Sequence, residues 1–271
     1  MLNNQELAKI AKRIRRNIIK MVTNAKSGHI GGAFSATEIA VSLYFNEMNI
    51  TAENVKDKAR DKFVLSKGHA SALLFAVLSE KGFLAEEELL TFRKINSNLQ
   101  GHPNMHYVTG VDMSTGSLGQ GLSTAVGMAL SYKLHKQDFR VYSLIGDGES
   151  EEGQIWEAAM AAAHYKLDNL CAILDMNGLQ IDGDVTEVMN PFPLDEKFKA
   201  FGWHVLYADG HDYDQLQAAY AKARTLKGKP TMIIAKTVKG KGVSFMENQA
   251  GWHGVAPTPE QAEAALKELE D

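Results

Sequence analysis

The chain has 271 residues, of which 45% are apolar and 23% charged, with a formal net charge of −4. This composition is typical of a folded globular protein, and the slightly acidic balance provides no basic surface for nucleic acid or an anionic membrane. The single cysteine, Cys171, excludes an intrachain disulfide and a cysteine-based zinc site, which favours a reducing cytoplasm. No apolar stretch approaches the roughly 20 residues of a membrane span, and the N-terminus lacks a signal-peptide pattern. We therefore expect a cytoplasmic protein.

Segments with helical periodicity alternate with short apolar runs along the chain, which predicts an α/β fold. The periodicity predicts helices over residues 5–24, 36–47, 70–80, 86–94, 119–136, 152–165, 212–226 and 259–269. The apolar runs predict strands at Phe63–Leu65, Arg140–Ile145, Leu170–Leu174, His204–Tyr207 and Met232–Ala235. Continuous apolar runs are typical of a mostly parallel sheet with helices on both faces. No repeat or linker divides the sequence, so we expect one domain over residues 1–271 with long, functional loops at about 95–118 and 176–192.

Two of the predicted strands end in a polar residue beside glycine. Gly146-Asp147-Gly148 follows one strand, and Asn177 follows the next, 30 residues after Asp147. Such spacing fits a strand-helix-strand unit, in which both polar groups lie in the crevice beyond the carboxyl ends of the strands. Carboxylate and amide oxygens suit Mg²⁺, and the glycines allow a diphosphate to approach the backbone. Taken alone, the tripeptide also fits a turn in which the aspartate caps a helix.

Five of the nine histidines adjoin a glycine, namely His29, His69, His102, His211 and His253. A ring in this setting projects from a tight turn, and any one of them alone fits a loop or capping residue. Five together favour a site at which imidazoles donate to oxygens or move protons.

Three further clusters have more than one interpretation. The glycines of residues 116–121 resemble a nucleotide loop, but a dinucleotide fingerprint should follow a strand directly, and polar residues precede this one. Glu149, Glu151 and Glu152 begin a helix, where carboxylates stabilise the macrodipole. The stretch 239–242, Lys-Gly-Lys-Gly, could cradle a phosphate, but we expect a flexible cover over the site with mostly solvated lysines.

Together these motifs resemble the thiamine diphosphate enzymes and, among them, the N-terminal cofactor-binding half of transketolase. The matching words appear in family order from about residue 5 to residue 256. They are Ser27-Gly28-His29, Leu65-Ser66-Lys67-Gly68-His69, Gly101-His102-Pro103, Thr115-Gly116-Ser117-Leu118-Gly119-Gln120-Gly121, Gly146-Asp147-Gly148 through Asn177, Ile181-Asp182-Gly183 and Trp252-His253-Gly254. Two positions depart from the family pattern, because Ile30 and Ser117 stand where relatives often have proline.

The resemblance implies a thiamine diphosphate-binding fold and a set of site residues. It implies thiamine diphosphate with Mg²⁺, or Ca²⁺ or Mn²⁺, as cofactors, with metal ligands from Asp147, Asn177 and Leu179. The implied cofactor-binding residues are His69, Gly116, Ser117, Leu118, Gly146, Asp147, Gly148, Asn177, Ile181 and His253. The implied catalytic residues are His29 and His102 on the sugar side and Glu152 at a subunit interface.

The resemblance also implies an activity and a partner. Transketolases move a two-carbon ketol unit from a ketose phosphate to an aldose phosphate, and they run on through a pyrimidine-binding and a C-terminal domain. We therefore expect this chain to be the N-terminal subunit of a split transketolase, with a C-terminal partner subunit in an α2β2 assembly. The alternatives are another thiamine diphosphate ketol enzyme, such as a deoxyxylulose phosphate synthase-like or pathway-specific transketolase, and a non-catalytic cofactor-binding module.

Overall fold

A five-stranded parallel sheet forms the centre of the protein, whose computed structural model describes residues 1–270. The strands lie in the order β1-β2-β3-β7-β6, so all their carboxyl ends meet at one edge. Their bounds are Lys62–Leu65 (β1), Val141–Gly146 (β2), Leu170–Met176 (β3), His204–Asp209 (β6) and Thr231–Lys236 (β7). The five predicted strands and the α/β class are confirmed.

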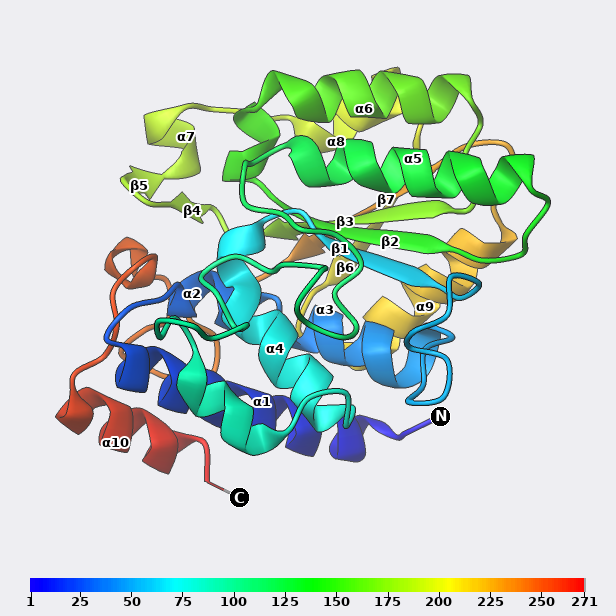
Figure 1. Ribbon diagram of the computed structural model, residues 1–271. Helices are drawn as coiled ribbons and strands as arrows, with labels where there is room; N and C mark the ends of the chain where they lie inside the picture. Colours follow the sequence, from blue (N-terminus) through cyan, green and yellow to red (C-terminus); the bar gives the residue numbers. More distant parts are fainter. Residues whose placement is uncertain (271) are drawn as a thin grey trace.

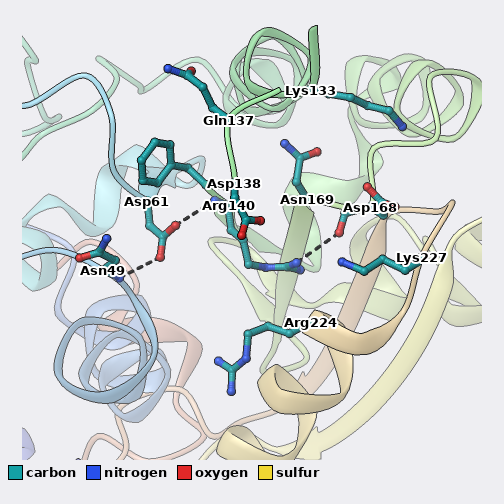
Figure 2. A pocket seen from close by; sticks show the side chains of 11 residues that line it. Asn49, Asp61, Lys133, Gln137, Asp138, Arg140, Asp168, Asn169, Arg224 and Lys227 are labelled. Carbon is teal, nitrogen blue, oxygen red and sulfur yellow. Dashed lines mark hydrogen bonds between the residues drawn. The ribbon is translucent and has the colours of Figure 1, made fainter. Parts of the chain in front are cut away.

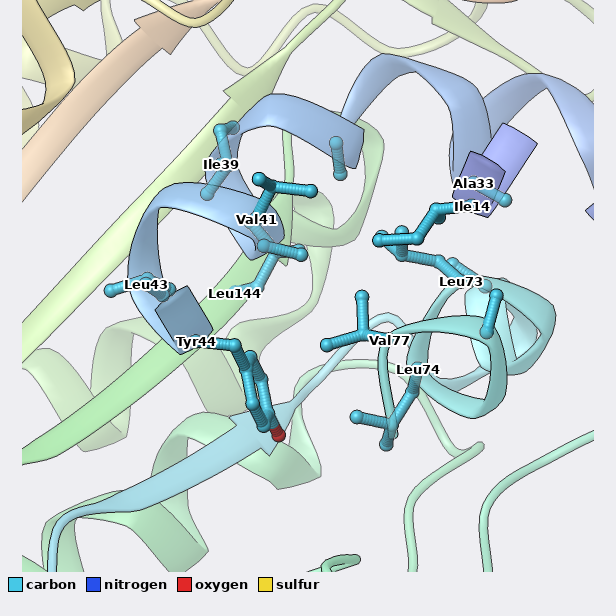
Figure 3. Close-up of a cluster of buried hydrophobic side chains, with 14 of the residues drawn as sticks. Ile14, Ala33, Ile39, Val41, Leu43, Tyr44, Leu73, Leu74, Val77 and Leu144 are labelled. Atoms are coloured by element: carbon cyan, nitrogen blue, oxygen red, sulfur yellow. The ribbon is translucent and has the colours of Figure 1, made fainter. Parts of the chain in front are cut away.

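Helices cover both faces of this sheet (Figure 1). One face carries α5 (Gln120–Leu134), α6 (Gly153–His164) and α8 (Leu194–Ala200). The other carries α1 (Asn4–Ala25), α2 (Ile30–Ser35), α3 (Thr37–Ser42), α4 (Ser71–Glu80) and α9 (Tyr213–Thr225), and α10 (Pro259–Glu268) packs on α1. Alternate residues of β3 therefore enter two separate cores, with Ile173 on the α3 side and Leu174 on the α5 side. Figure 3 shows part of the core on the α3 side, where Tyr44, Val77 and Leu144 of β2 are among the buried side chains.

Local signals explain where several helices begin. Asn3 and Glu6 form a reciprocal capping box at the start of α1, and Asp212 caps α9 by accepting from two backbone amides. A buried ion pair between Arg15 of α1 and Glu38 of α3 joins two helices below the sheet, with N···O of 2.6 Å. Within residues 1–270, none of the helices combines the length and the apolar character needed to cross a membrane.

The structure corrects some predicted helices. The helix expected over 86–94 is a 3₁₀ turn at Glu86–Thr91, and the chain then reverses at Arg93, whose φ is 57°. The helix expected over 36–47 is divided into α3 and a π-helical turn at Leu43–Glu47. The long loop expected at 176–192 contains a small hairpin, β4 (Leu179–Gln180) and β5 (Gly183–Asp184), and one helical turn, α7 (Val185–Val188); the short helices α2 and α8 were also not predicted.

Candidate functional site

A cavity of about 370 Å³ lies at the carboxyl edge of the sheet, beyond the ends of β1, β2 and β3. Twelve of the fourteen predicted site residues line it. Those of the loops and strand ends are Gly116, Leu118, Gly146, Gly148, Leu179 and Ile181. Those with polar side chains are His29, His69, Asp147, Glu152, Asn177 and His253. The expectation that Asp147 and Asn177 would share one crevice is met because β2 and β3 pair directly.

The two remaining predicted residues lie beside the cavity. The ring of His102 packs on Gly116, where an added Cβ would lie 3.0 Å from its Cδ2. Ser117 is exposed at the adjacent position of the same loop. The loop itself is anchored by Thr115, whose hydroxyl donates to the carbonyl of Leu65 at the end of β1, at 2.6 Å.

Asp147 is a buried carboxylate without a cationic partner within ion-pair distance among residues 1–270. Its oxygens accept from the amides of Gly148 at 2.9 Å and Gly178 at 2.6 Å, while burial raises its pKa to about 6. Asn177 accepts from the amide of Leu179 through Oδ1 at 3.1 Å. Burying an unpaired carboxylate is costly, so this group fits a site completed by a divalent cation, for which these oxygens are suitable ligands.

Lys239 lines the same cavity as Asp147 and is almost completely buried, at 2% exposure. The expectation that this lysine would be solvated is therefore wrong. Its Nζ donates to the carbonyl of Leu179 at 2.9 Å and contacts Nδ1 of His253 at 3.0 Å. Burial and the nearby Lys67 lower its pKa to about 8. A desolvated ammonium beside imidazoles is suited to hold a phosphate or diphosphate.

Lys67 and Asp175 form a second buried pair, which the sequence motifs did not predict. Lys67 Nζ contacts Asp175 Oδ2 and donates to the carbonyl of Gly32 at 2.8 Å. Ser35 and Thr237 also donate to the Asp175 carboxylate. Burial opposes ionisation, but the Lys67 ammonium and these hydroxyls lower the pKa of Asp175. The available signal was the carboxylate directly after the apolar run of β3.

Three of the predicted histidines form one cluster. The ring of His29 lies 5.1 Å from that of His69 and 5.5 Å from that of His253, and the latter two are stacked at 5.3 Å. Burial, followed by neighbouring cations, lowers the pKa of His29 to about 4 and that of His253 to about 3. Both rings are therefore neutral at pH 7 and can each donate one hydrogen bond.

The glutamates after β2 have three different environments. Glu149 is buried and accepts from Ser66 Oγ at 2.5 Å, Gly119 N at 2.9 Å and Gly146 N at 3.1 Å. It therefore joins three segments that shape the cavity and is more than a helix cap. Glu151 accepts from the Gln180 amide at 2.8 Å, and Glu152 is exposed at the cavity rim.

A larger cavity, of about 500 Å³, lies at the opposite, amino edge of the sheet (Figure 2). Its charges are mixed, and several of them already have partners. Asp61 accepts from the amides of Asn49 and Arg140, each at 2.8 Å, while the Arg140 guanidinium donates to the Asp168 carbonyl at 3.3 Å. Ligands of parallel sheets bind beyond the carboxyl ends of the strands, so we place the functional site at the smaller cavity.

The cavity at the carboxyl edge of the parallel sheet contains an uncompensated carboxylate, a cluster of imidazoles and a buried lysine. These groups define an α/β protein that binds an anionic cofactor. Comparison with known proteins identifies the class further. The chain belongs to the family described as "Transketolase, thiamine diphosphate binding domain", which it matches over residues 7–269.

Two relatives of similar length and one solved structure illustrate this similarity. An apulose-4-phosphate transketolase subunit of Phocaeicola vulgatus is 43% identical, over 95% of this chain and 91% of that protein. The 6-deoxy-6-sulfo-D-fructose transketolase subunit SqwG of Clostridium sp. is 45% identical, over 95% and 94%. The transketolase of Campylobacter jejuni superposes with a TM-score of 0.93 at 35% identity, covering 99% of this chain but 43% of that one. The chain thus spans less than half the length of that transketolase.

Proposed function

We propose that this protein is the N-terminal, cofactor-binding subunit of a split transketolase, which moves a two-carbon ketol unit from a ketose phosphate to an aldose phosphate. The observation that carries the proposal is that one cavity is lined both by the buried Asp147, which has no ion-pair partner within residues 1–270, and by the buried Lys239. Relatives of nearly the same length that are named as transketolase subunits support the division between two chains.

The cavity offers separate groups for the metal and for the diphosphate. Asp147, Asn177 and the carbonyl of Leu179 would hold Mg²⁺, because all three present oxygen atoms at the ends of β2 and β3. The Leu179 carbonyl already accepts from Lys239, and its second lone pair remains for a metal. His69 and His253 would donate to the diphosphate together with Lys239. Gly146 and Gly148 would let it approach the backbone.

The thiamine itself would lie along the loop of Gly116, Ser117 and Leu118, with Ile181 on the hairpin opposite. When bound, thiamine diphosphate supplies the carbon centre at which ketol bonds are made and broken. This chain orients that centre and provides neutral imidazoles. His29 and His102 would donate hydrogen bonds to substrate oxygens as charge develops on them.

The partner subunit would cover the open side of this cavity. Apolar side chains of the hairpin and of the residue after α7 are exposed, with Ile181 at 63% and Met189 at 63%. Glu152, exposed at the rim, would contact a second subunit, and we propose an α2β2 assembly. Exposed apolar groups beside a site are a common mark of an interface.

The substrate is the finer part of this proposal. The relatives named above carry the names of two different pathway-specific sugars, apulose-4-phosphate and 6-deoxy-6-sulfo-D-fructose. A transketolase dedicated to one sugar pathway is therefore the second candidate function.

Reconstitution tests both candidates. The purified chain, a purified partner carrying the pyrimidine-binding domain, and their mixture are assayed with thiamine diphosphate, Mg²⁺ and a panel of ketose phosphates and sulfonates. We expect turnover only in the mixture, and a matched mixture with Asp147→Ala should be inactive. Full turnover by the single chain would exclude the split enzyme, while a complex that binds the cofactor but transfers no ketol unit would indicate a non-catalytic module.

A further inference from the structure

Arg93 links the two segments that carry the predicted substrate-side histidines. Its Nη1 donates to Ser27 Oγ at 3.0 Å, and its Nη2 lies 3.4 Å from Nδ1 of His29. An added Cβ on Gly101 would lie 2.7 Å from the guanidinium carbon, so the group packs directly on the residue before His102. The guanidinium thus lies between the His29 and His102 segments.

The backbone of Arg93 has an unusual conformation at this position between the His29 and His102 segments. Its φ of 57° is in the left-handed region, which disfavours non-glycine residues, and its amide donates to the Leu99 carbonyl at 2.8 Å. Strain of this kind occurs mainly where the surrounding structure requires it, often at functional sites.

The guanidinium has no carboxylate partner at ion-pair distance in the part of the chain that the structure describes. Its Nε is buried without a hydrogen-bond acceptor, and its other close aromatic neighbour is the Phe92 ring, at 5.5 Å. A half-buried arginine that is not neutralised loses hydration without the usual compensation. An ion-pairing role in stability therefore does not explain this residue.

A guanidinium can only donate hydrogen bonds, and this restricts the protonation of the ring beside it. If Nδ1 of His29 carried a proton, two N–H groups would face each other. Nδ1 must accept, which leaves the single proton of the neutral ring on Nε2.

We propose that Arg93 is a positioning residue, which holds His29 in the Nε2–H form so that the ring presents a fixed donor to a substrate oxygen. The inference rests on the proposed ketol transfer, because it assigns the donor that such a substrate would meet. Arg93 acts through His29.

The charges around His29 are consistent with this role. Burial is the largest cause that lowers its pKa to about 4, and the cation of Arg93 is the second. Without Arg93, burial still holds the pKa of His29 below its ordinary value, but the ring becomes easier to protonate. The titratable and charged groups that face it are Arg93, His102, Lys239, His69 and His253.

Nuclear magnetic resonance of the chain labelled with [¹⁵N]histidine tests the inference without any activity assay. Long-range ¹H–¹⁵N spectra report the tautomer of each ring, and the spectrum of His29→Gln assigns the signals. In the wild type we expect the Nε2–H form and no protonation of His29 down to about pH 5. In Arg93→Met we expect a mixture of tautomers and a pKa raised by about one unit.

Two further variants control this experiment. Arg93→Lys keeps the charge but cannot reach Ser27 and His29 together, so it should loosen the tautomer while raising the pKa less. Arg16→Met removes an arginine of α1 that donates to the Leu266 carbonyl, and it should leave the His29 signals unchanged. An unchanged Nε2–H tautomer in folded Arg93→Met and Arg93→Lys would overturn the inference.

Activity of the assembled complex gives the second readout. We expect Arg93→Met to lower kcat/KM for the ketose about tenfold and to move the acid limb of the pH profile upward, with partial rescue in Arg93→Lys. If the complex transfers ketol units and Arg93→Met matches wild type at every pH, the inference fails. If the tautomer changes as expected but no complex transfers a ketol unit, the proposed function fails while the assignment of His29 stands.

Discussion

Glu149 offers a strong test of how the cavity is built. Three donors from separate segments converge on its buried carboxylate: Ser66 after β1, Gly119 before α5, and Gly146 at the end of β2. Glu149→Ala leaves all three without their acceptor, at about 1–3 kcal/mol for each stranded donor. Burial raises the pKa of the Glu149 carboxyl group, which means that the charged group is costly to bury. Its removal therefore restores part of the lost free energy of unfolding. We expect the free energy of unfolding to fall by about 2–4 kcal/mol.

Glu149→Gln refines the prediction. The amide oxygen can still accept from Ser66 and Gly119, but the amide nitrogen then faces the Gly146 N–H, so we expect a loss of about 1–2 kcal/mol. Urea unfolding of the chain, followed by circular dichroism, measures both. Glu157→Ala, on the exposed face of α6, is the matched control and should stay within about 0.5 kcal/mol of wild type. If Glu149→Ala also stayed within that range, the assigned network would not hold the loops.

Four other predictions concern single side chains of the site and the core. Asp147→Ala and Asn177→Ala should each weaken Mg²⁺-dependent thiamine diphosphate binding by about 100-fold in calorimetry, and unchanged affinity would remove them from the metal site. His102→Ala should keep the cofactor affinity but lower ketol transfer about 10²–10⁴-fold; loss of affinity with normal transfer at saturation would reverse this assignment. Lys239→Met should lower cofactor affinity about 10–100-fold with little loss of stability, because its buried ammonium is itself costly; equal affinity would contradict this. Burial alone would raise the pKa of Glu38, but its arginine partner lowers it to about 2, so urea unfolding should show that wild type loses more stability below pH 4.5 than Glu38→Gln does; equal losses would contradict this.

The strands were predictable because a parallel sheet covered on both faces needs continuous apolar runs. Leu170–Leu174 is such a run, and in the structure β3 has alternate side chains in the two cores. The order of the strands was not predictable, since it depends on which crossover each helix makes. The helix predicted over residues 86–94 was wrong. The composition of this segment suits a helix, but the chain turns at Arg93.

The polar ends of β2 and β3 were predictable as neighbours in one crevice, since their position after a strand determines where they lie. The burial of Lys239 was not. Its Lys-Gly-Lys-Gly stretch has the composition of a solvated loop. At Gly240, φ is 76° and an added Cβ would lie 2.3 Å from the Met246 carbonyl oxygen, so only glycine fits this turn, which follows directly after Lys239. Burial of a charge depends on such long-range packing, which composition does not encode.

The charged side chains of the cavity explain why a bound ligand would stabilise it. Lys67 is neutralised by Asp175, and the histidine rings are neutral at pH 7, so neither contributes a free charge. Glu149 is buried as well, but three hydrogen bonds satisfy its carboxylate, whereas Asp147 and Lys239 are a buried anion and a buried cation that form no ion pair within residues 1–270. A ligand that brings both a cation and a phosphate group would compensate both at once, whereas a metal or an anion alone would compensate one. Binding of the metal and of the diphosphate should therefore be mutually dependent, which is the behaviour of a site selected for a metal-diphosphate complex.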